Sequence, residues 1–534
     1  MTPWTQRGVI AVCVAFVAAG MLFVPRLGIE VDEAIVANGI YHHGDPWYSW
    51  KIAGAEVPVM LISYLGALKT WFYSGVFLFA APRPIVLRLP MLLFAAASLW
   101  LFFELLDRTI GRGAAWIGML LLATDTSYLL LNMADYGPVT LQFVFKLAAL
   151  VLLVRFHQNT SSPKKARHDL AWAFFLFGLG MWDKAIFAWV LFGLAIAAMA
   201  VFPRELRKHL TRANIAVAGL AMLAGALPLV IYNIARPLDT FRSNAHVGQM
   251  ELPHKVEILK QTMEGYVLFG FLTAVEPGPQ PGEPKHWYQS LSLAASRWMG
   301  HPRRNAMLWA ASASVLSLAL LWKWLWNSQA RQPILFGLIA CGATWLPMVL
   351  TAGAGGAAHH VILLWPFQLL PIAAVLARIP AVPAALVTAL LCGTNLAVTN
   401  QYYADLIRDG PSVRWTDAMD PLQRYLTDLH PRQIVAADWG FMETMNLQSE
   451  GELPMIYADA GSDPAAQESL GGLLRDPLNI FVAHTAGTAF HPQERAVLED
   501  LALREHYQEE PLTTIHDRNG RPTFDVFRFR KLHL

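Results

Sequence analysis

The sequence predicts a polytopic α-helical membrane protein with about eleven transmembrane helices and a C-terminal soluble α/β domain. Hydrophobic residues make up 55% of its 534 residues and charged residues only 15%, whereas soluble domains carry roughly 25% charge. Mean hydropathy is +0.37, and the apolar stretches lie before about residue 400. The net charge of +2 indicates no nucleic-acid partner. The three cysteines fall in apolar segments, so neither a disulfide framework nor a cysteine metal site is expected.

Eleven apolar segments approach the roughly 20 residues that a membrane-crossing helix needs. The first follows Arg7 and contains a weak cleavage-like site, but we prefer an uncleaved anchor over a secretory signal. Segment 56–80 is apolar but interrupted by Pro58, Lys69 and Gly75, so we expect interfacial helices in this first outer loop. The predicted spans are 8–25, 85–106, 115–134, 138–156, 170–182, 185–202, 214–232, 306–324, 333–351, 361–378 and 383–399.

The positions of Lys and Arg predict the orientation, because short cytoplasmic loops carry an excess of both residues. With a cytoplasmic N-terminus, the inner loops are rich in Lys and Arg, whereas the opposite short loops at 135–137 and 352–360 hold neither. We therefore expect an integral protein of the cytoplasmic (inner) membrane, surrounded by its lipids. The 233–305 loop and the C-terminal domain would then be extracytoplasmic.

The chain changes character near residue 400, which predicts a membrane domain at 1–400 and an α/β domain at 401–534. Short apolar runs alternate with helical patterns in the second part, at 434–437, 455–457, 463–474, 480–483 and 492–503. A closing hairpin is predicted from 512–516 and 523–529, because Asn519-Gly520 supplies the positive φ angles of a tight turn. Gly471-Gly472 follows no predicted strand, so it is not a nucleotide-binding motif.

An acidic pair, Asp32-Glu33, lies a few residues beyond the first apolar segment. Carboxylates near a helix start stabilise the positive end of its dipole by about 0.3 to 1 kcal/mol, so a structural role is one interpretation. The other is chemical: one carboxylate can act as a general base toward an acceptor hydroxyl.

Two further outer residues carry charge next to spans. Asp135 precedes Gly137-Pro138 in a tight turn, where it either caps the next span or contributes to a site. Lys184, beside Asp183, lies between two short apolar runs. Charge inside a membrane costs about 2.5 to 3.5 kcal/mol and is usually paired or functional, so we expect Lys184 to bind an anion.

Two other polar groups have simpler interpretations. Asp125, followed by Thr126-Ser127, is expected to cap a helix that breaks and restarts inside the bundle. His359-His360 follows a glycine-rich loop and could bind a metal or phosphate, but adjacent histidines lack the i, i+4 spacing of the common zinc motif. A polar anchor of the loop is the preferred interpretation.

Together these features resemble the glycosyltransferase C superfamily, in its protein O-mannosyltransferase-like and aminoarabinose-transferase-like branch. The resemblance covers roughly residues 8–400. The elements that carry it are the Asp32-Glu33 loop, Leu87-Arg88-Leu89-Pro90, Gly111-Arg112-Gly113-Ala114-Ala115, Asp135, Gly180-Met181-Trp182-Asp183-Lys184-Ala185, and His359-His360-Val361 with Pro366.

The resemblance implies inverting transfer of a sugar from a polyprenyl-phosphate donor, on the outer face of the membrane. The acceptor would be a hydroxyl on a lipid, a glycan or a protein. A divalent cation is left open and no other cofactor is expected. The implied catalytic residues are Asp32, Glu33 and Asp135; the implied donor-phosphate ligand is Lys184, with Lys69 and Arg236 as candidates; and the implied substrate-binding residues are Glu56, His359 and His360.

One departure puts the phosphate site in question. Where the aminoarabinose-transferase branch has an acidic residue followed by Lys-Pro, this chain has Glu56-Val57-Pro58. Lys51, Lys69 and Arg236 are the candidates to replace the missing lysine. The aromatic 233–305 loop, with Tyr266, Trp287 and Tyr288, would contact sugar or lipid, or simply anchor at the interface.

Two rival functions fit the sequence less well. A transporter of a lipid-linked or small polar substrate should place ionisable sites near mid-membrane in matched halves, and no such repeat is present. A sensor would need an inner signalling module, for which the inner loops are too short. The enzyme is the preferred hypothesis.

Overall fold

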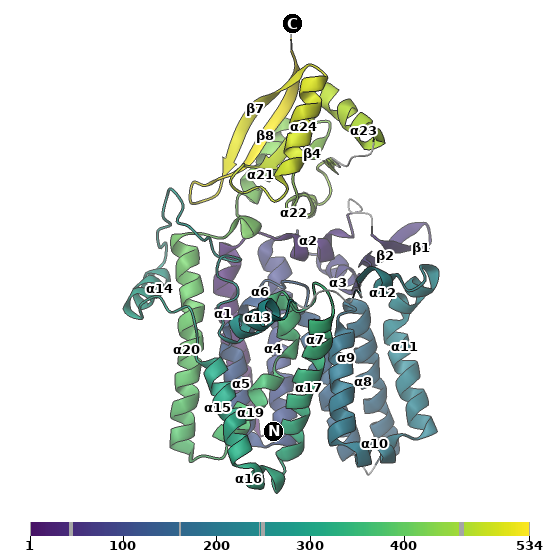
Figure 1. Ribbon diagram of the computed structural model, residues 1–534, viewed down its shortest axis with the longest axis vertical. Helices are drawn as coiled ribbons and strands as arrows, with labels where there is room; N and C mark the ends of the chain where they lie inside the picture. Colours follow the sequence, from purple (N-terminus) through teal and green to yellow (C-terminus); the bar gives the residue numbers. More distant parts are fainter. Residues whose placement is uncertain are drawn as a thin grey trace.

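The computed structural model describes residues 2–41, 46–159, 162–244, 246, 251–458 and 464–532. Long helices run side by side in a bundle, and a smaller domain with a β-sheet stands on one end of it (Figure 1). The chain starts at the opposite end of the bundle from this sheet domain (Figure 1). The bundle helices are α1 (Pro3–Phe23), α4 (Pro84–Thr109), α5 (Arg112–Thr124), α6 (Thr126–Met133), α7 (Thr140–Gln158), α8 (Pro163–Asp183), α9 (Phe187–Val201), α11 (Arg212–Ala235), α15 (Met307–Leu320), α17 (Arg331–Leu350), α19 (Leu370–Leu376) and α20 (Ala381–Arg408).

The chain is an integral membrane protein. Within the described ranges, six helices are long and apolar enough to cross a membrane, or nine if each of three bent pairs forms one span. The predicted count of eleven is not confirmed. Of the eleven predicted segments, α8 begins with charged residues and α15 has only 14 residues, and neither is among the nine.

Two helix breaks inside the bundle are satisfied by polar side chains. Asp125 lies at the 57° bend between α5 and α6, where its carboxylate accepts from the Tyr128 N–H at 2.8 Å and the Trp365 indole at 2.9 Å. This confirms its predicted capping role. At the 52° bend before α19, Lys146 Nζ donates to the carbonyls of Leu363 and Trp365 at 2.7 and 2.5 Å. Both bends thereby avoid leaving backbone groups unpaired in the apolar interior.

The loop between α1 and α4 differs from its prediction. Instead of interfacial helices throughout 56–80, the chain forms a hairpin and then one helix. Ala53 and Gly54 turn it at φ +51° and +85°, and the β-branched Val57 and Val59 favour an extended strand. The elements are η1 (Val24–Arg26), α2 (Val31–Asn38), β1 (Tyr48–Ile52), β2 (Ala55–Ile62), β3 (Leu65–Gly66) and α3 (Leu68–Val76).

Short helices complete both ends of the bundle. At the end that carries the sheet domain, the connection between α11 and α15 contains α12 (Asp239–Asn244), α13 (Leu252–Met263) and α14 (Trp287–Trp298), and α18 (Ala358–Val361) precedes η2 (Ile362–Leu364) and η3 (Phe367–Leu369). At the opposite end lie α10 (Pro203–His209) and α16 (Trp322–Trp326) (Figure 1).

The C-terminal domain is α/β, as predicted. Its five-stranded sheet has the order β5-β4-β6-β8-β7, with β4 parallel to β5 and β6, and with β8 antiparallel to β6 and β7. The predicted hairpin is confirmed as β7 and β8, although only Gly520 of its turn has positive φ (+73°). The elements are η4 (Val413–Trp415), α21 (Met419–Leu429), β4 (Ile434–Ala436), α22 (Met442–Gln448), β5 (Met455–Tyr457), α23 (Pro464–Arg475), β6 (Ile480–His484), α24 (Pro492–Arg504), β7 (Tyr507–His516) and β8 (Pro522–Lys531).

Alternating side chains cover the two faces of this sheet. Ile434 and Ala436 of β4 pack with α21 and α22, whereas Val435 packs with α23 and α24. This alternation follows from the two-residue period of a strand.

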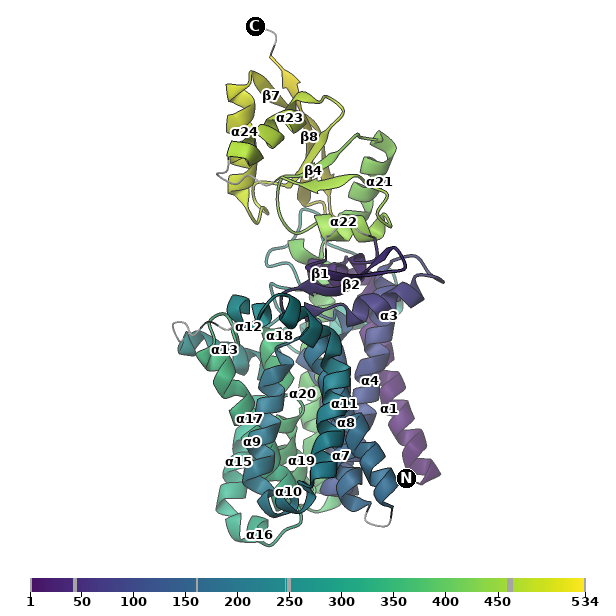
Figure 2. The ribbon, with the colours of Figure 1, turned by 90° about the vertical axis from the view of Figure 1, so that its right-hand side faces the viewer.

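The sheet domain rests on the first loop of the bundle (Figure 2). Leu447 of α22 joins an apolar cluster with Ile29 and Ala34, and the Thr444 hydroxyl donates to the Ile29 carbonyl at 3.3 Å. The C-terminal domain therefore contacts the segment that contains Asp32.

Candidate functional site

An acidic turn begins α2, and its backbone is fixed by its own side chains. The Glu30 carboxylate accepts from the Asp32 N–H at 2.7 Å, and the Glu33 carboxylate accepts from the Glu30 N–H at 3.3 Å. This reciprocal cap satisfies N–H groups that the first helical turn leaves free. We call residues 30–33 the acidic turn.

Glu33 is held by a buried arginine from α4. Arg88 Nε and Nη2 donate to the two oxygens of Glu33, each at 2.7 Å. The same guanidinium donates to the carbonyls of Val24, Leu27 and Gly28. Both side chains are buried, with exposed fractions of 0% for Arg88 and 3% for Glu33. Both oxygens of Glu33 are thus engaged with Arg88.

Asp32 is the partly exposed carboxylate of the acidic turn. One of its oxygens accepts from the Gly137 N–H at 3.2 Å. Burial raises the pKa of the Asp32 carboxyl above its ordinary value, and the positive charges of Lys184 and Arg414 together with the Gly137 N–H oppose that rise. A raised pKa and an accessible oxygen are the properties that a general base requires.

Asp135 approaches the same place from the turn between α6 and α7. Its backbone is in the left-handed region, at φ +41°. One carboxylate oxygen accepts from Lys69 Nζ of α3 at 2.5 Å, and the other accepts from the Thr140 N–H at 3.2 Å. Asp135 therefore caps α7 and also forms a buried ion pair with the first loop.

Lys184, in the connection between α8 and α9, is the fourth charged residue that lies close to the Gly137 turn. Its Nζ donates to the Gly137 carbonyl at 2.6 Å, so the two peptide groups of Gly137 contact Asp32 on one side and Lys184 on the other. The backbone of Lys184 also pairs with Leu65 in an antiparallel bridge. Desolvation lowers the pKa of the Lys184 ammonium to about 8, although Asp32 opposes this effect.

Of the two histidines, His359 packs against the Gly137 turn. A Cβ at Gly137, which has φ +68°, would lie only 2.2 Å from the His359 ring, so this packing requires glycine. The His359 ring meets Tyr136 edge-on at 4.7 Å, and His360 meets Trp189 at 6.0 Å. Among the described residues, no group of three or more His, Cys, Asp or Glu side chains is arranged to hold a metal ion.

Known structures share this architecture. ArnT from Cupriavidus metallidurans bound to undecaprenyl phosphate matches 98% of this chain and 98% of its own, with a TM-score of 0.58 at 13% identity. The Archaeoglobus fulgidus oligosaccharyltransferase in its apo form matches 100% of this chain and 75% of its own, with a TM-score of 0.51 at 12% identity. The arabinofuranosyltransferase AftD from Mycobacteria matches 98% of this chain but 41% of its own, with a TM-score of 0.51 at 14% identity.

The chain shares the fold of these three enzymes. This confirms the fold that the resemblance implied. No protein-family model and no curated protein sequence matches the chain, so the likeness lies in the arrangement of the helices rather than in residue identity.

Within this fold, the structure brings together most of the predicted site residues. Asp32, Asp135, Lys69 and Lys184 meet around the Gly137 turn, with His359 behind it, and Glu33 lies beside Asp32 but faces Arg88.

Glu56 and Arg236 lie elsewhere. Glu56 is exposed on the β1–β2 hairpin, where its nearest charged partner is Lys51 at 3.8 Å. Arg236, at the end of α11, lies over the Trp47 ring at 5.4 Å. Neither side chain contacts the residues around Gly137, so the structure does not bring the substrate-binding candidate Glu56 or the phosphate-binding candidate Arg236 to this group.

Three charged residues of this candidate site were missed. Glu30 could have been found, because Glu30-x-x-Glu33 before an apolar run is a capping pattern. Arg88 could also have been found, since an arginine in an apolar segment needs a buried partner. Arg414, whose Nη1 lies 3.7 Å from Glu30, comes from the distant linker to the sheet domain. No local pattern in the sequence indicates that contact.

Proposed function

We propose that this protein is a membrane glycosyltransferase that moves a sugar from a polyprenyl-phosphate donor to a hydroxyl acceptor, with inversion at the anomeric carbon. The observation that carries the proposal is Asp32, a partly exposed carboxylate between the Gly137 N–H and two cations, Lys184 and Arg414, in a glycosyltransferase C fold. The similar ArnT structure is described as bound to undecaprenyl phosphate, which supports a lipid-phosphate donor.

In the proposed reaction, Asp32 accepts the proton of the acceptor hydroxyl. The acceptor oxygen then forms a bond to the anomeric carbon from the face opposite the phosphate. The bond between that carbon and the phosphate oxygen breaks, and its electron pair stays on the departing polyprenyl phosphate. Positive charge from Lys184 stabilises that anion, and Asp135 with Lys69 holds the turn on which Asp32 and Lys184 meet.

The site would face away from the cytoplasm, as the distribution of Lys and Arg predicts. The acidic turn and the sheet domain lie at the same end of the bundle, opposite the start of the chain (Figure 1). A cytoplasmic N-terminus in the inner membrane therefore places acceptor and donor headgroup on the outer face, where lipid, glycan and protein acceptors are available.

The test is donor turnover by the purified protein in lipid nanodiscs. Polyprenyl-phosphate sugars are supplied together with a cell-envelope extract as the source of acceptor hydroxyls, and released polyprenyl phosphate is measured by mass spectrometry. Asp32→Asn keeps the shape of the side chain and removes its basicity, so we expect turnover to fall about 10²- to 10⁴-fold. Asp500→Asn, at an exposed position of α24, is the matched control and should keep full turnover. Full turnover by Asp32→Asn overturns the assignment of the base.

The substrates are tested separately in cells. Polyprenyl-phosphate sugars and cell-envelope glycans are compared by mass analysis with and without the protein. Loss of one glycan together with accumulation of one lipid-linked sugar is expected. Unchanged profiles of both would contradict transferase activity.

A further inference from the structure

The linker between α20 and α21, residues 409–418, packs directly against the chain just before the acidic turn. The Gly28 N–H donates to the Trp415 carbonyl at 2.8 Å. A Cβ at Gly28 would lie 2.0 Å from the Thr416 carbonyl oxygen, so the two backbones are in direct contact. The buried Trp415 ring lies against Arg88, at 5.6 Å from its guanidinium carbon. The linker therefore contacts the buried arginine that holds Glu33.

Arg414, the preceding residue of the linker, extends toward the carboxylates. Its Nη1 lies 3.7 Å from Glu30 Oε1. Its guanidinium carbon lies 4.9, 5.4 and 5.7 Å from three aromatic ring centroids, which belong to Phe490, Trp439 and Phe271. Contacts of this kind attract a cation to the ring faces.

The rings that hold Arg414 come from two parts of the molecule. Trp439 and Phe490 belong to the sheet domain and contact each other edge-on at 5.6 Å. Phe271 belongs to the connection between α11 and α15 and also packs on Trp415 and Tyr136. The position of the guanidinium therefore depends on the sheet domain being docked against the bundle.

The charge of Arg414 acts on Asp32 as well as on Glu30. Lys184 and Arg414 favour the ionised form of Asp32 and Asp135 opposes it, whereas Lys69 and Arg88 are committed to Asp135 and Glu33. Arg414 also opposes the rise in the pKa of Glu30, which burial raises to about 8. The groups around Asp32 are Glu30 and Glu33 on its own turn, Asp135 and Tyr136 before α7, Tyr64 beside β3, Lys184 after α8, and Arg414.

We propose that Arg414 is a positioning residue, which is held by the aromatic rings of the docked sheet domain and keeps the carboxylate of Asp32 ionised. The sheet domain thereby influences the chemistry of the bundle without contributing a group that contacts the reacting atoms. This inference rests on the proposed role of Asp32 as the base.

A labelling experiment tests the charge effect without any assay of transfer. Dicyclohexylcarbodiimide reacts with protonated carboxyl groups, and peptide mass spectrometry resolves labelling at Asp32 from that at Glu30 and Glu33. The full-length protein is labelled across a pH series in nanodiscs. Arg414→Gln removes a positive charge that favours the ionised carboxylate. We therefore expect the midpoint of Asp32 labelling to move to higher pH by about half a unit or more.

Two further variants separate charge from packing. Arg414→Lys keeps the charge, so its midpoint should stay nearer that of the wild type, although it stacks less well on the rings. Trp439→Leu keeps Arg414 but removes one ring, and a smaller shift in the same direction is expected. Arg297→Gln, at an exposed position of α14, is the matched control and should leave the midpoint unchanged.

The result that overturns this inference is an unchanged midpoint in folded Arg414→Gln. A folding defect is recognised by size-exclusion chromatography, and in that case Trp439→Leu decides: an unchanged midpoint there also overturns the inference. If Asp32→Asn keeps its turnover while Arg414→Gln still shifts the midpoint, the proposed function fails and the charge effect stands. If Asp32→Asn is inactive, the acid limb of kcat/KM should move to higher pH in Arg414→Gln.

Discussion

Two neighbouring carboxylates, Asp32 and Glu33, differ in what surrounds them. Adjacent residues of a helix point about 100° apart, so one faces the bundle and the other faces the Gly137 turn. Glu33 meets Arg88 through two charge-assisted hydrogen bonds, a geometry that suits the planar guanidinium. Asp32 keeps part of its surface exposed. Glu33 is thus engaged in the fold through Arg88, whereas Asp32 remains available for its proposed role as the base.

The ion pair between Arg88 and Glu33 predicts that substitution of Glu33 lowers the stability of the fold, whereas substitution of Asp32 does not. Glu33→Ala leaves the Arg88 charge buried and unpaired, so we expect a loss of about 3–5 kcal/mol in the free energy of unfolding. Thermal unfolding in detergent, followed by tryptophan fluorescence, measures the change. In the double variant Glu33→Leu with Arg88→Met, much of that loss should be recovered. Asp32→Asn is the comparison, and an equal loss there would contradict the division of roles.

For single residues, the sequence indicated which charged side chains belong to the candidate site, but not which of them pair with one another. Asp32, Asp135 and Lys184 were predicted from charge beside apolar segments and Lys69 from the family resemblance, and the four meet in the structure. Their partners depend on a helix turn, a hairpin and a linker that lie far apart in the chain. Arg414 is the clearest example, because no sequence pattern near it indicates that it contacts Glu30.

At the scale of single elements, the first loop shows where a pattern was misread. Apolar content near a membrane favoured interfacial helices, but Val57 and Val59 are β-branched and lie between the glycines at 54 and 66. Those signals are typical of a short hairpin. The hairpin matters to the site, because its last strand pairs with Lys184 and leads directly into the helix that carries Lys69.

The helix α14 directs polar side chains toward the bundle and apolar side chains outward, the reverse of a helix in a soluble protein. Its inward side chains are polar, and the Ser296 hydroxyl donates to Gln401 of α20 at 2.6 Å. Its outward side carries Trp287, Leu291 and Trp298, with exposed fractions of 77%, 60% and 88%. The helix lies beside α20 near the end of the bundle that carries the sheet domain (Figure 1). A helix with an outward apolar face and terminal tryptophans suits the interface of a bilayer.

We therefore predict that α14 lies in the membrane interface. A spin label at Leu291→Cys, in protein whose three cysteines are replaced by serine, should be more accessible to oxygen than to a water-soluble nickel chelate. Electron paramagnetic resonance in nanodiscs measures both. Leu503→Cys, which is 64% exposed on the sheet domain, should show the reverse order. Equal preference for the nickel chelate at both positions would contradict this placement.

For the whole molecule, the sequence predicted two parts and could not predict how they join. The change in polarity near residue 400 indicated the C-terminal domain, although α20 continues through that boundary to Arg408. The docking depends on side chains at the tip of a hairpin and on loops of the bundle. Such contacts have no periodicity, so they are not visible in the sequence alone.

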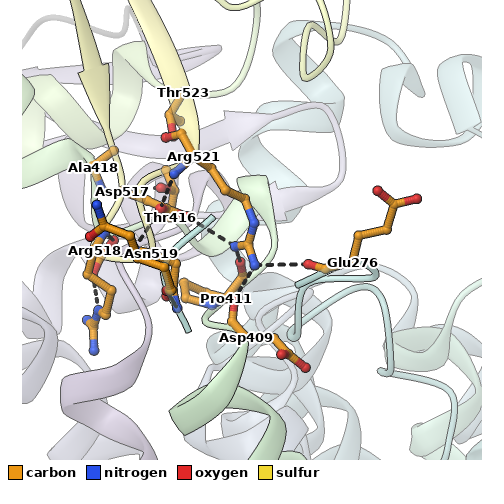
Figure 3. A network of polar contacts seen from close by, with 12 residues as sticks. Glu276, Asp409, Pro411, Thr416, Ala418, Asp517, Arg518, Asn519, Arg521 and Thr523 are labelled. Carbon is orange, nitrogen blue, oxygen red and sulfur yellow. Dashed lines mark hydrogen bonds and ion pairs between the residues drawn. The ribbon is translucent and has the colours of Figure 1, made fainter. Parts of the chain in front are cut away.

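The tip of the β7–β8 hairpin forms a further contact between the two parts (Figure 3). Arg521 donates to the carbonyls of Glu276 and Pro411 at 3.0 and 3.4 Å, and also to that of Asp409. Asn519 exchanges hydrogen bonds with the backbone of Gln280, each at 2.9 Å. These bonds tie the hairpin to the connection before α14 and to the end of α20.

Removing the Arg521 side chain from the hairpin tip should weaken the docking of the sheet domain and lower transfer activity, while the bundle stays folded. Each lost hydrogen bond to a charged group costs about 1.5–3 kcal/mol, so Arg521→Ala should raise hydrogen–deuterium exchange in 274–282 and 408–416. Since Arg414 lies in the second segment, donor turnover should fall with the docking of the domain. Arg504→Ala, an arginine that pairs with Asp500 on its own helix, is the control and should change neither. Increased exchange confined to the hairpin tip, with normal turnover, would show that the hairpin does not hold the linker in place.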